Sequence, residues 1–163
     1  MKELLENFTG QKPSVKTLFS YEFKGNKVVF YYEAYNSSLE SYSNIDNDKL
    51  YDGNVVELFL DIGEENKYLE IEVAPNGAKF VASICNREIT FIDPSFVKTK
   101  SVIKDDAYFV EMIIDLDKLG NPSNMMFNAF RIEGKENEKR TLCALSPTYC
   151  GTFHVRERFI PLK

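Results

Sequence analysis

Acidic side chains recur in two apolar stretches, and they are the residues best suited to acid–base chemistry. Glu57 lies inside the apolar run 55–60, and Glu70 and Glu72 alternate with the apolar residues of 69–73. Residues two apart on a strand share a face, with Cα atoms about 6.6 Å apart. A retaining glycosidase needs two carboxyl groups about 5–5.5 Å apart, flanking a sugar. Alternating acids on a solvated strand are common, and we interpret Glu70 and Glu72 as such a face.

The single histidine, His154, restricts nucleophilic catalysis. A Ser-His-Asp or Cys-His arrangement would have to use it. His154 lies between Phe153 and Val155, in a segment that we expect to form a late strand, and we interpret it as structural. The glycines that follow apolar runs are isolated and precede no helical pattern, so the sequence shows no phosphate-binding loop.

Metal-binding patterns are weak. Residues 46–53 (Asp-Asn-Asp-Lys-Leu-Tyr-Asp-Gly) resemble a calcium loop, but the fifth position is Leu50 and the glycine falls at the eighth. Cys85, Cys143 and Cys150 form neither a disulfide framework nor a zinc pattern, and we interpret them as free thiols. We therefore predict no cofactor. An irregular structural Ca²⁺ site in 46–53, built partly from backbone carbonyls, is the alternative to a solvated acidic loop.

Length and charge restrict the number of domains and the classes of partner that the chain could have. The chain has 163 residues, enough for one domain over 1–163, and its formal charge of −5 argues against binding to nucleic acid. No apolar run reaches the roughly 20 residues that would span a membrane. The charged start is unlike a signal peptide, so we expect the chain as written to be cytoplasmic, or extracellular if a leader was removed. Nothing in the sequence indicates an oligomeric state.

Strand patterns dominate the sequence. Period-two or β-rich runs, separated by turn residues, occupy 18–23, 28–35, 55–62, 67–84 (a hairpin), 108–116 and 125–132. Helical patterns are confined to 115–120, which ends in glycine, and to one turn at the start. We predict an all-β fold, an antiparallel β-sandwich or jelly roll with at most short helical turns.

Several short motifs follow one another in a fixed order. Val-Glu-Leu-Phe-Leu-Asp ends at residue 61, and a strand then ends in Ala-Pro-Asn-Gly at 74–77. Phe-Asn-Ala-Phe-Arg (127–131), Ser-Pro (146–147) and Phe-His (153–154) come later. In order and spacing, over about residues 15–162, the sequence resembles the family 9 carbohydrate-binding modules, β-sandwiches related to the DOMON domains. The resemblance implies a carbohydrate ligand and no catalysis.

The resemblance also implies a sugar site made of two tryptophans and a fringe of charged and amide groups. Aromatic rings stack on the apolar faces of a pyranose, and polar groups bind its hydroxyls. The first aromatic falls on Tyr51, six residues before Glu57, which matches the family's site glutamate. Asn128 and Arg131 match its Asn-x-x-Arg element. The structural alternatives are a rim-packing Tyr51, a Glu57–Arg131 ion pair that orders the sandwich, and an Asn128 that satisfies backbone groups.

The sequence departs from the family at the site. The second tryptophan would fall at Ala144 or Leu145, which cannot stack on a sugar, and Asn54 replaces an acidic residue. Tyr149 could supply the missing ring from a neighbouring loop position. The predicted ligand-binding set is therefore Tyr51, Glu57, Asn128, Arg131 and Tyr149.

Three other functions remain open at the sequence level. A module with this fold could have lost sugar binding and serve protein interaction. It could accompany a glycoside hydrolase in carbohydrate catabolism, although the chain has no room for a catalytic domain of its own. A haem site, known among DOMON relatives, would need His154 and either Met125 or Met126 as axial ligands.

Overall fold

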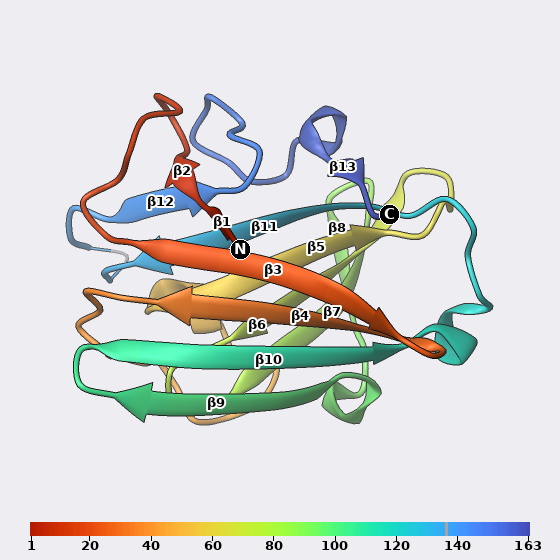
Figure 1. Cartoon of the computed structure of the whole chain (residues 1–163), viewed down its shortest axis with the longest axis horizontal. Helices are drawn as coiled ribbons and strands as arrows, with labels where there is room; N and C mark the ends of the chain where they lie inside the picture. The colour runs from red at the N-terminus through yellow and green to blue at the C-terminus, as the bar shows by residue number, and fades with distance from the viewer. Residues whose placement is uncertain (136) are drawn as a thin grey trace.

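Two antiparallel sheets pack face to face in the computed structural model, which describes residues 1–135 and 137–163 (Figure 1). The first sheet has the order β1-β3-β4-β10-β9, and the second has β2-β12-β11-β5-β6-β7-β8 with β13 beside β11. The strands of the first sheet are β1 (Lys2–Glu3), β3 (Thr17–Lys24), β4 (Lys27–Ala34), β9 (Lys98–Lys104) and β10 (Ala107–Asp115). Those of the second are β2 (Leu5–Glu6), β5 (Val55–Asp61), β6 (Lys67–Val73), β7 (Lys79–Cys85), β8 (Glu88–Phe91), β11 (Met126–Glu133), β12 (Thr141–Ala144) and β13 (Ile160–Pro161).

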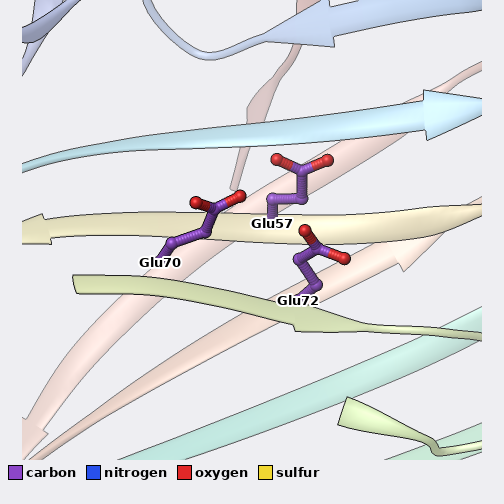
Figure 2. A group of neighbouring side chains, drawn as sticks. All are labelled: Glu57, Glu70 and Glu72. Atoms are coloured by element: carbon purple, nitrogen blue, oxygen red, sulfur yellow. The ribbon is translucent and has the colours of Figure 1, made fainter. Parts of the chain in front are cut away.

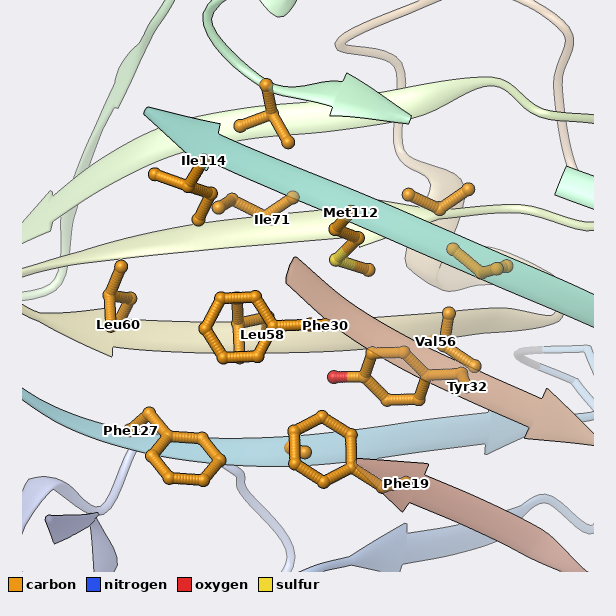
Figure 3. Close-up of a cluster of buried hydrophobic side chains, with 14 of the residues drawn as sticks. Phe19, Phe30, Tyr32, Val56, Leu58, Leu60, Ile71, Met112, Ile114 and Phe127 are labelled. Atoms are coloured by element: carbon orange, nitrogen blue, oxygen red, sulfur yellow. The ribbon is translucent and has the colours of Figure 1, made fainter. Parts of the chain in front are cut away.

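The space between the sheets is filled by alternate residues of the long strands. Val56, Leu58 and Leu60 of β5 point inward and meet residues of the first sheet such as Phe30 and Tyr32 (Figure 3). Each large apolar side chain buried in this way contributes roughly 1.5–3 kcal/mol. This layer is the main core, and it fixes which residues of β5 and β6 face outward.

The other face of the second sheet is also apolar. The alternate residue Phe59 of β5 belongs to a second cluster, with Tyr68 of β6, Phe130 of β11 and Phe153 from the late loop. Phe153 stacks on Phe130 with ring centroids 4.2 Å apart. Strands β5 and β6 are therefore covered on both faces, which explains why all residues of β5 are buried.

The predicted antiparallel β-sandwich is confirmed. Seven of the eight predicted strands correspond within a residue or so to β3, β4, β5, β6, β7, β10 and β11. Strands β8, β9 and β12 and the two-residue strands β1, β2 and β13 were not predicted. β8 and β9 lie at sheet edges, where charged and exposed residues weaken the alternation, and β12 has only four residues.

Short helical turns also follow the prediction in part. A 3₁₀ turn, η3 (Leu116–Leu119), ends at Gly120, which adopts a left-handed φ of 72°. The other turns are η1 (Leu50–Asp52), η2 (Pro94–Phe96) and η4 (Arg156–Arg158). The opening residues were predicted to form a helical turn, which is wrong, because β1 pairs with β3 and β2 pairs with β12. Among the described residues, no helix is long and apolar enough to cross a membrane.

Candidate functional site

An open hollow of about 340 Å³ lies on the outer face of the second sheet. Its lining combines carboxyl groups of the sheet, aromatic and aliphatic side chains, and one arginine. The residues that border it are Tyr51, Glu57, Glu70, Phe80, Ile89, Ile132, Arg140, Leu142, Gly151, Thr152, Phe153 and His154. The hollow is therefore mixed in polarity, as sites for small polar ligands commonly are.

Tyr51 lies at the edge of this hollow, in η1. Its neighbour Leu50 is fully buried and anchors the turn in the second apolar cluster. The Tyr51 ring packs edge-on against Phe80, with centroids 6.2 Å apart and an interplanar angle of 80°. Nη2 of Arg140 donates a hydrogen bond to the Tyr51 carbonyl oxygen. The ring is thus held in place while the side chain stays partly exposed beside the hollow.

Three glutamates gather on the same outer face. Glu57 of β5 pairs directly with Glu72 of β6 across the ladder, and Glu70 lies two residues from Glu72. One carboxylate oxygen from each lies within 4.8 Å of those from the other two, and Figure 2 shows the three carboxyl groups close together. The interpretation of Glu70 and Glu72 as a solvated face is wrong. Their exposed fractions are 6% and 0%, because η1 and the second apolar cluster cover this face.

Burial makes these carboxyl groups hold their protons. Loss of solvation raises the pKa of Glu70 to about 7. Loss of solvation and the charge of Glu70 raise the pKa of Glu57 well above its usual range, and the nearby Arg140 partly opposes this effect. The pKa of Glu72 is also raised well above its usual range, first by burial and then by Glu57 and Glu70. Burial and the mutual repulsion of the three groups thus both favour their protonated forms.

Residues 152–154 form another part of the rim. His154 stacks on Phe59 with centroids 5.0 Å apart, and its Nδ1 is hydrogen-bonded to Tyr68 Oη at 2.5 Å. Burial lowers the pKa of His154, so the ring is neutral at pH 7. The predicted strand at this place is wrong, since residues 153–155 form none. The interpretation of His154 as a residue that packs in the fold agrees with these contacts, although it also faces the hollow.

Several solved structures share this architecture. A protein from Bacteroides uniformis ATCC 8492, described as a candidate carbohydrate-binding protein, superposes with a TM-score of 0.80 at 16% identity, over 96% of this chain and 83% of its own. A family 9 carbohydrate-binding module from Caldicellulosiruptor kristjanssonii in complex with glucose has a TM-score of 0.72 at 19% identity, over 99% and 83%. A Caldicellulosiruptor kristjanssonii family 9 module in complex with cellotriose has a TM-score of 0.63 at 20% identity, over 88% and 71%.

The chain has the fold of the family 9 carbohydrate-binding modules. The order of the sequence motifs predicted a resemblance to these modules, and this prediction is confirmed for the fold. No protein-family model matches the sequence, and a search of curated proteins finds no match either. The likeness is therefore carried by the fold, and the chemistry of the site follows from this chain's own residues.

Arg131, predicted as a ligand-binding residue from the Asn-x-x-Arg pattern, lies between the sheets. It pairs across the ladder with Val56, an inward-facing residue, whereas Glu57 pairs with Phe130. Its Nη1 donates to the carbonyl oxygens of Lys16 and Tyr35 and to Thr17 Oγ1. Its Nη2 forms an ion pair with Glu133 at 2.7 Å. The alternative of a Glu57–Arg131 ion pair is wrong, because the two side chains leave the sheet on opposite faces.

Asn128, the other residue of that pattern, is fully buried. Its Nδ2 donates to the Ser146 carbonyl oxygen at 2.8 Å, and its Oδ1 accepts from the backbone N–H groups of Ser146 and Ala129. The amide therefore ties β11 to the segment after β12. This is the backbone-satisfying role given as the alternative, and Asn128 does not border the hollow.

Tyr149, proposed to replace the second family 9 tryptophan, lies outside the hollow. Its side chain is 56% exposed, and the Arg158 guanidinium lies 4.9 Å from the ring centroid. A Cβ at Gly10 would lie 3.0 Å from Tyr149 Oη, so the ring packs against that turn. The structure thus brings Tyr51 and Glu57 together at the hollow and places Asn128, Arg131 and Tyr149 elsewhere.

The loop 46–53 uses its side chains to hold the backbone. Asn47 Nδ2 donates to the Ile92 carbonyl oxygen, and its Oδ1 accepts from the Val81 N–H. Asp46 Oδ1 accepts from the Lys79 N–H at 3.0 Å. Across residues 1–135 and 137–163, the one group of three or more possible metal ligands is the glutamate cluster, not this loop. The loop connects η1 to β7 and so supports Tyr51.

Most residues of the hollow were not predicted as ligand-binding, among them Arg140 and Phe153. Arg140 precedes β12 in a polar segment without periodicity, so no sequence pattern marks it. Phe153 belongs to the Phe-His motif, which was the available signal. Its exposed fraction is 7%, so it offers an edge rather than an open ring.

A methyl group added at Gly53 tests how η1 is held. A Cβ there would lie 2.6 Å from the Tyr42 backbone nitrogen, so the loop must shift. We expect Gly53→Ala to lower the free energy of unfolding by about 1–3 kcal/mol, measured by urea denaturation. Gly151→Ala is the matched control, since its Cβ would meet nothing closer than 3.9 Å. Equal stabilities of the two variants would contradict this close approach.

Proposed function

We propose that the hollow on the second sheet binds carbohydrate and does not hydrolyse it. The observation that carries this proposal is the combination of a partly exposed Tyr51 ring with carboxyl groups and an arginine around one hollow of about 340 Å³. The fold is shared with family 9 modules whose structures hold glucose and cellotriose. A role as an accessory to a glycoside hydrolase in carbohydrate catabolism agrees with this proposal.

Each part of the hollow meets one need of a sugar. The Tyr51 ring offers an apolar face to the C–H groups of a pyranose, and Ile89, 52% exposed, extends that apolar surface. Glu57 and Glu70 accept hydrogen bonds from hydroxyl groups, and Arg140 donates to them. Because Phe80 and Phe153 are nearly covered, stacking comes from one ring only. We therefore expect weaker binding than a site with two facing rings would give.

The position of the carboxyl groups favours binding over hydrolysis. A glycosidase places two carboxyl groups on either side of the bond that it cleaves. Glu57 and Glu70, the two carboxyl groups that border the hollow, both rise from the floor formed by β5 and β6, so they approach a bound sugar from one side. Hydrolysis of a chromogenic glycoside that disappears in Glu57→Gln would overturn this part of the proposal.

Removing the Tyr51 ring is the direct test. We expect calorimetric titration with glucose and cellotriose to give saturable binding to the native chain. We expect Tyr51→Ala to bind at least about tenfold more weakly, a loss of roughly 1.4 kcal/mol, because the stacking surface is gone.

Two tyrosines elsewhere serve as matched controls. Tyr31 of β4 lies on the outer face of the first sheet, where it hydrogen-bonds to Glu22, whereas β5 and β6 belong to the second sheet. Tyr149 lies outside the hollow, so Tyr149→Ala and Tyr31→Ala should both bind like the native chain. The absence of saturable heat for any soluble sugar would favour a module that has lost sugar binding. If only Tyr149→Ala lost binding, the sugar site would lie at the loop that contains Tyr149 and not at the hollow.

A further inference from the structure

The glutamate cluster leaves buried oxygen atoms without hydrogen-bond donors. Among the described residues, no backbone group, hydroxyl group or basic side chain donates a hydrogen bond to either oxygen of Glu72 or to Oε1 of Glu57. The neighbouring carboxyl group of Glu70 is near enough to share a proton with Glu72. Glu72 is fully buried, and Glu57 is 2% exposed. A buried polar atom without a partner costs free energy, and two carboxylates that face each other across a ladder repel. The unpartnered oxygens of Glu72 therefore point to a missing positive partner.

Basic side chains do not supply that partner. Among the described residues, none of the ion pairs involves Glu57, Glu70 or Glu72. Arg140 is near enough to Glu57 to act on its charge, but its Nη2 is engaged by the Tyr51 carbonyl oxygen. The other large buried cation, Arg131, lies on the opposite face of the sheet and is paired with Glu133. Three carboxyl groups thus share a site in which Arg140 offsets part of the charge of Glu57, while none of the ion pairs among the described residues involves any of the three.

We propose that Glu57, Glu70 and Glu72 bind a Ca²⁺ ion at the floor of the hollow. Oxygen ligands from carboxylates are those that hard divalent cations prefer. One oxygen from each glutamate lies within 4.8 Å of the others, so the three carboxyl groups are close enough to share one ion. Ca²⁺ accepts carboxylate oxygens in flexible geometry, whereas Mg²⁺ demands near-ideal octahedral geometry and gives up its waters reluctantly, so a buried carboxylate cluster favours Ca²⁺.

The open side of the cluster provides the remaining coordination and the entry path. Glu57 and Glu70 both border the hollow, so water can reach the ion and complete the six to eight oxygen ligands that Ca²⁺ takes. The three carboxyl groups come from two paired strands (Figure 2), which hold them in fixed register. The competing state is a cluster that shares protons and excludes the ion.

Titration with the metal salt alone tests the site. We expect chelator-treated protein to bind CaCl₂ with saturation at one ion per chain in calorimetry at about pH 8, where carboxyl groups are easily deprotonated. MgCl₂ should bind more weakly. Because no saccharide is present, the result does not depend on the proposed sugar binding. Absence of saturable Ca²⁺ binding, or tighter binding of Mg²⁺, would overturn the proposal.

Glutamine variants test which residues act as ligands. Glu72→Gln keeps the size of the side chain and removes its charge, and we expect roughly 100-fold weaker Ca²⁺ binding. Glu70→Gln gives the same information if Glu72→Gln fails to fold. Glu111→Gln is the matched control, a glutamate on the first sheet's β10 that pairs with Tyr31, and it should bind like the native chain. Unchanged Ca²⁺ affinity in both cluster variants would contradict the site.

Discussion

Arg131→Ala should lose about 3–5 kcal/mol of unfolding free energy, the usual cost of removing one partner of a buried ion pair. A domain of ordinary stability has about 5–15 kcal/mol in total, so the variant should be marginally folded. The guanidinium is fully buried and donates to Thr17 Oγ1 and to two backbone carbonyl oxygens while pairing with Glu133. Alanine would remove the cationic partner of Glu133 and the donor to the Tyr35 carbonyl oxygen, whereas the Lys16 carbonyl oxygen would keep its bond from the Tyr35 N–H.

Urea denaturation followed by circular dichroism measures this loss. Lys24→Ala is the control, because its ion pair with Glu22 is exposed to solvent and exposed pairs contribute little; its midpoint should stay close to the native value. A native midpoint in Arg131→Ala would contradict the structural role. A folded variant that had lost only sugar binding would instead restore Arg131 as a ligand-binding residue.

The calcium-free protein should lose stability as the pH rises from about 4.5 to about 7. The pKa of Glu70 is about 7 in the folded chain, against 4.5 for an ordinary glutamate. Over this range the unfolded chain has already released the proton that the folded chain keeps, so deprotonation favours unfolding. Glu70 alone should account for a loss on the order of 3 kcal/mol. The raised pKa values of Glu57 and Glu72 act in the same direction.

Thermal unfolding in the presence of chelator, at several pH values, measures this slope. His154 acts in the opposite direction up to pH 6.5, its ordinary pKa, because burial lowers the pKa of the folded ring. Comparison with Glu70→Gln isolates the glutamate contribution, and that variant should show a flatter profile. Excess Ca²⁺ should restore stability to the native chain at about pH 8. If the native chain became more stable relative to Glu70→Gln as the pH rose from about 4.5 to about 7, the raised pKa of Glu70 would be contradicted.

Local sequence patterns predicted the strands that alternate clearly, such as β6, and those that form a β-rich apolar run, such as β5. They could not predict edge strands such as β9, where lysines occupy much of the run. The burial of Glu70 and Glu72 also could not be predicted from the residues around them. The side chains that cover them come from η1 and from the late loop, far away in the sequence.

The site was predicted in part for the same reason. Tyr51 and Glu57 belong to one continuous segment, and the structure places both at the hollow. The placement of Arg131 depends on the register of β11 against β5, and a shift of one residue would have reversed its face. No property of the sequence around Arg131 fixes that register. Arg140 lies in an aperiodic segment, and only the folded chain brings it to Tyr51.

The double coverage of β5 and β6 has a consequence for how the molecule moves. Backbone amides shielded on both sides exchange with solvent only through the rarest openings, whereas amides of sheet margins such as β8 exchange early. We therefore expect the backbone amides of β5 and β6, the strands that carry Glu57, Glu70 and Glu72, to exchange more slowly than those of the sheet edges. Because the strands that form the floor of the hollow are rigid before a ligand binds, binding should cost little conformational entropy of the protein.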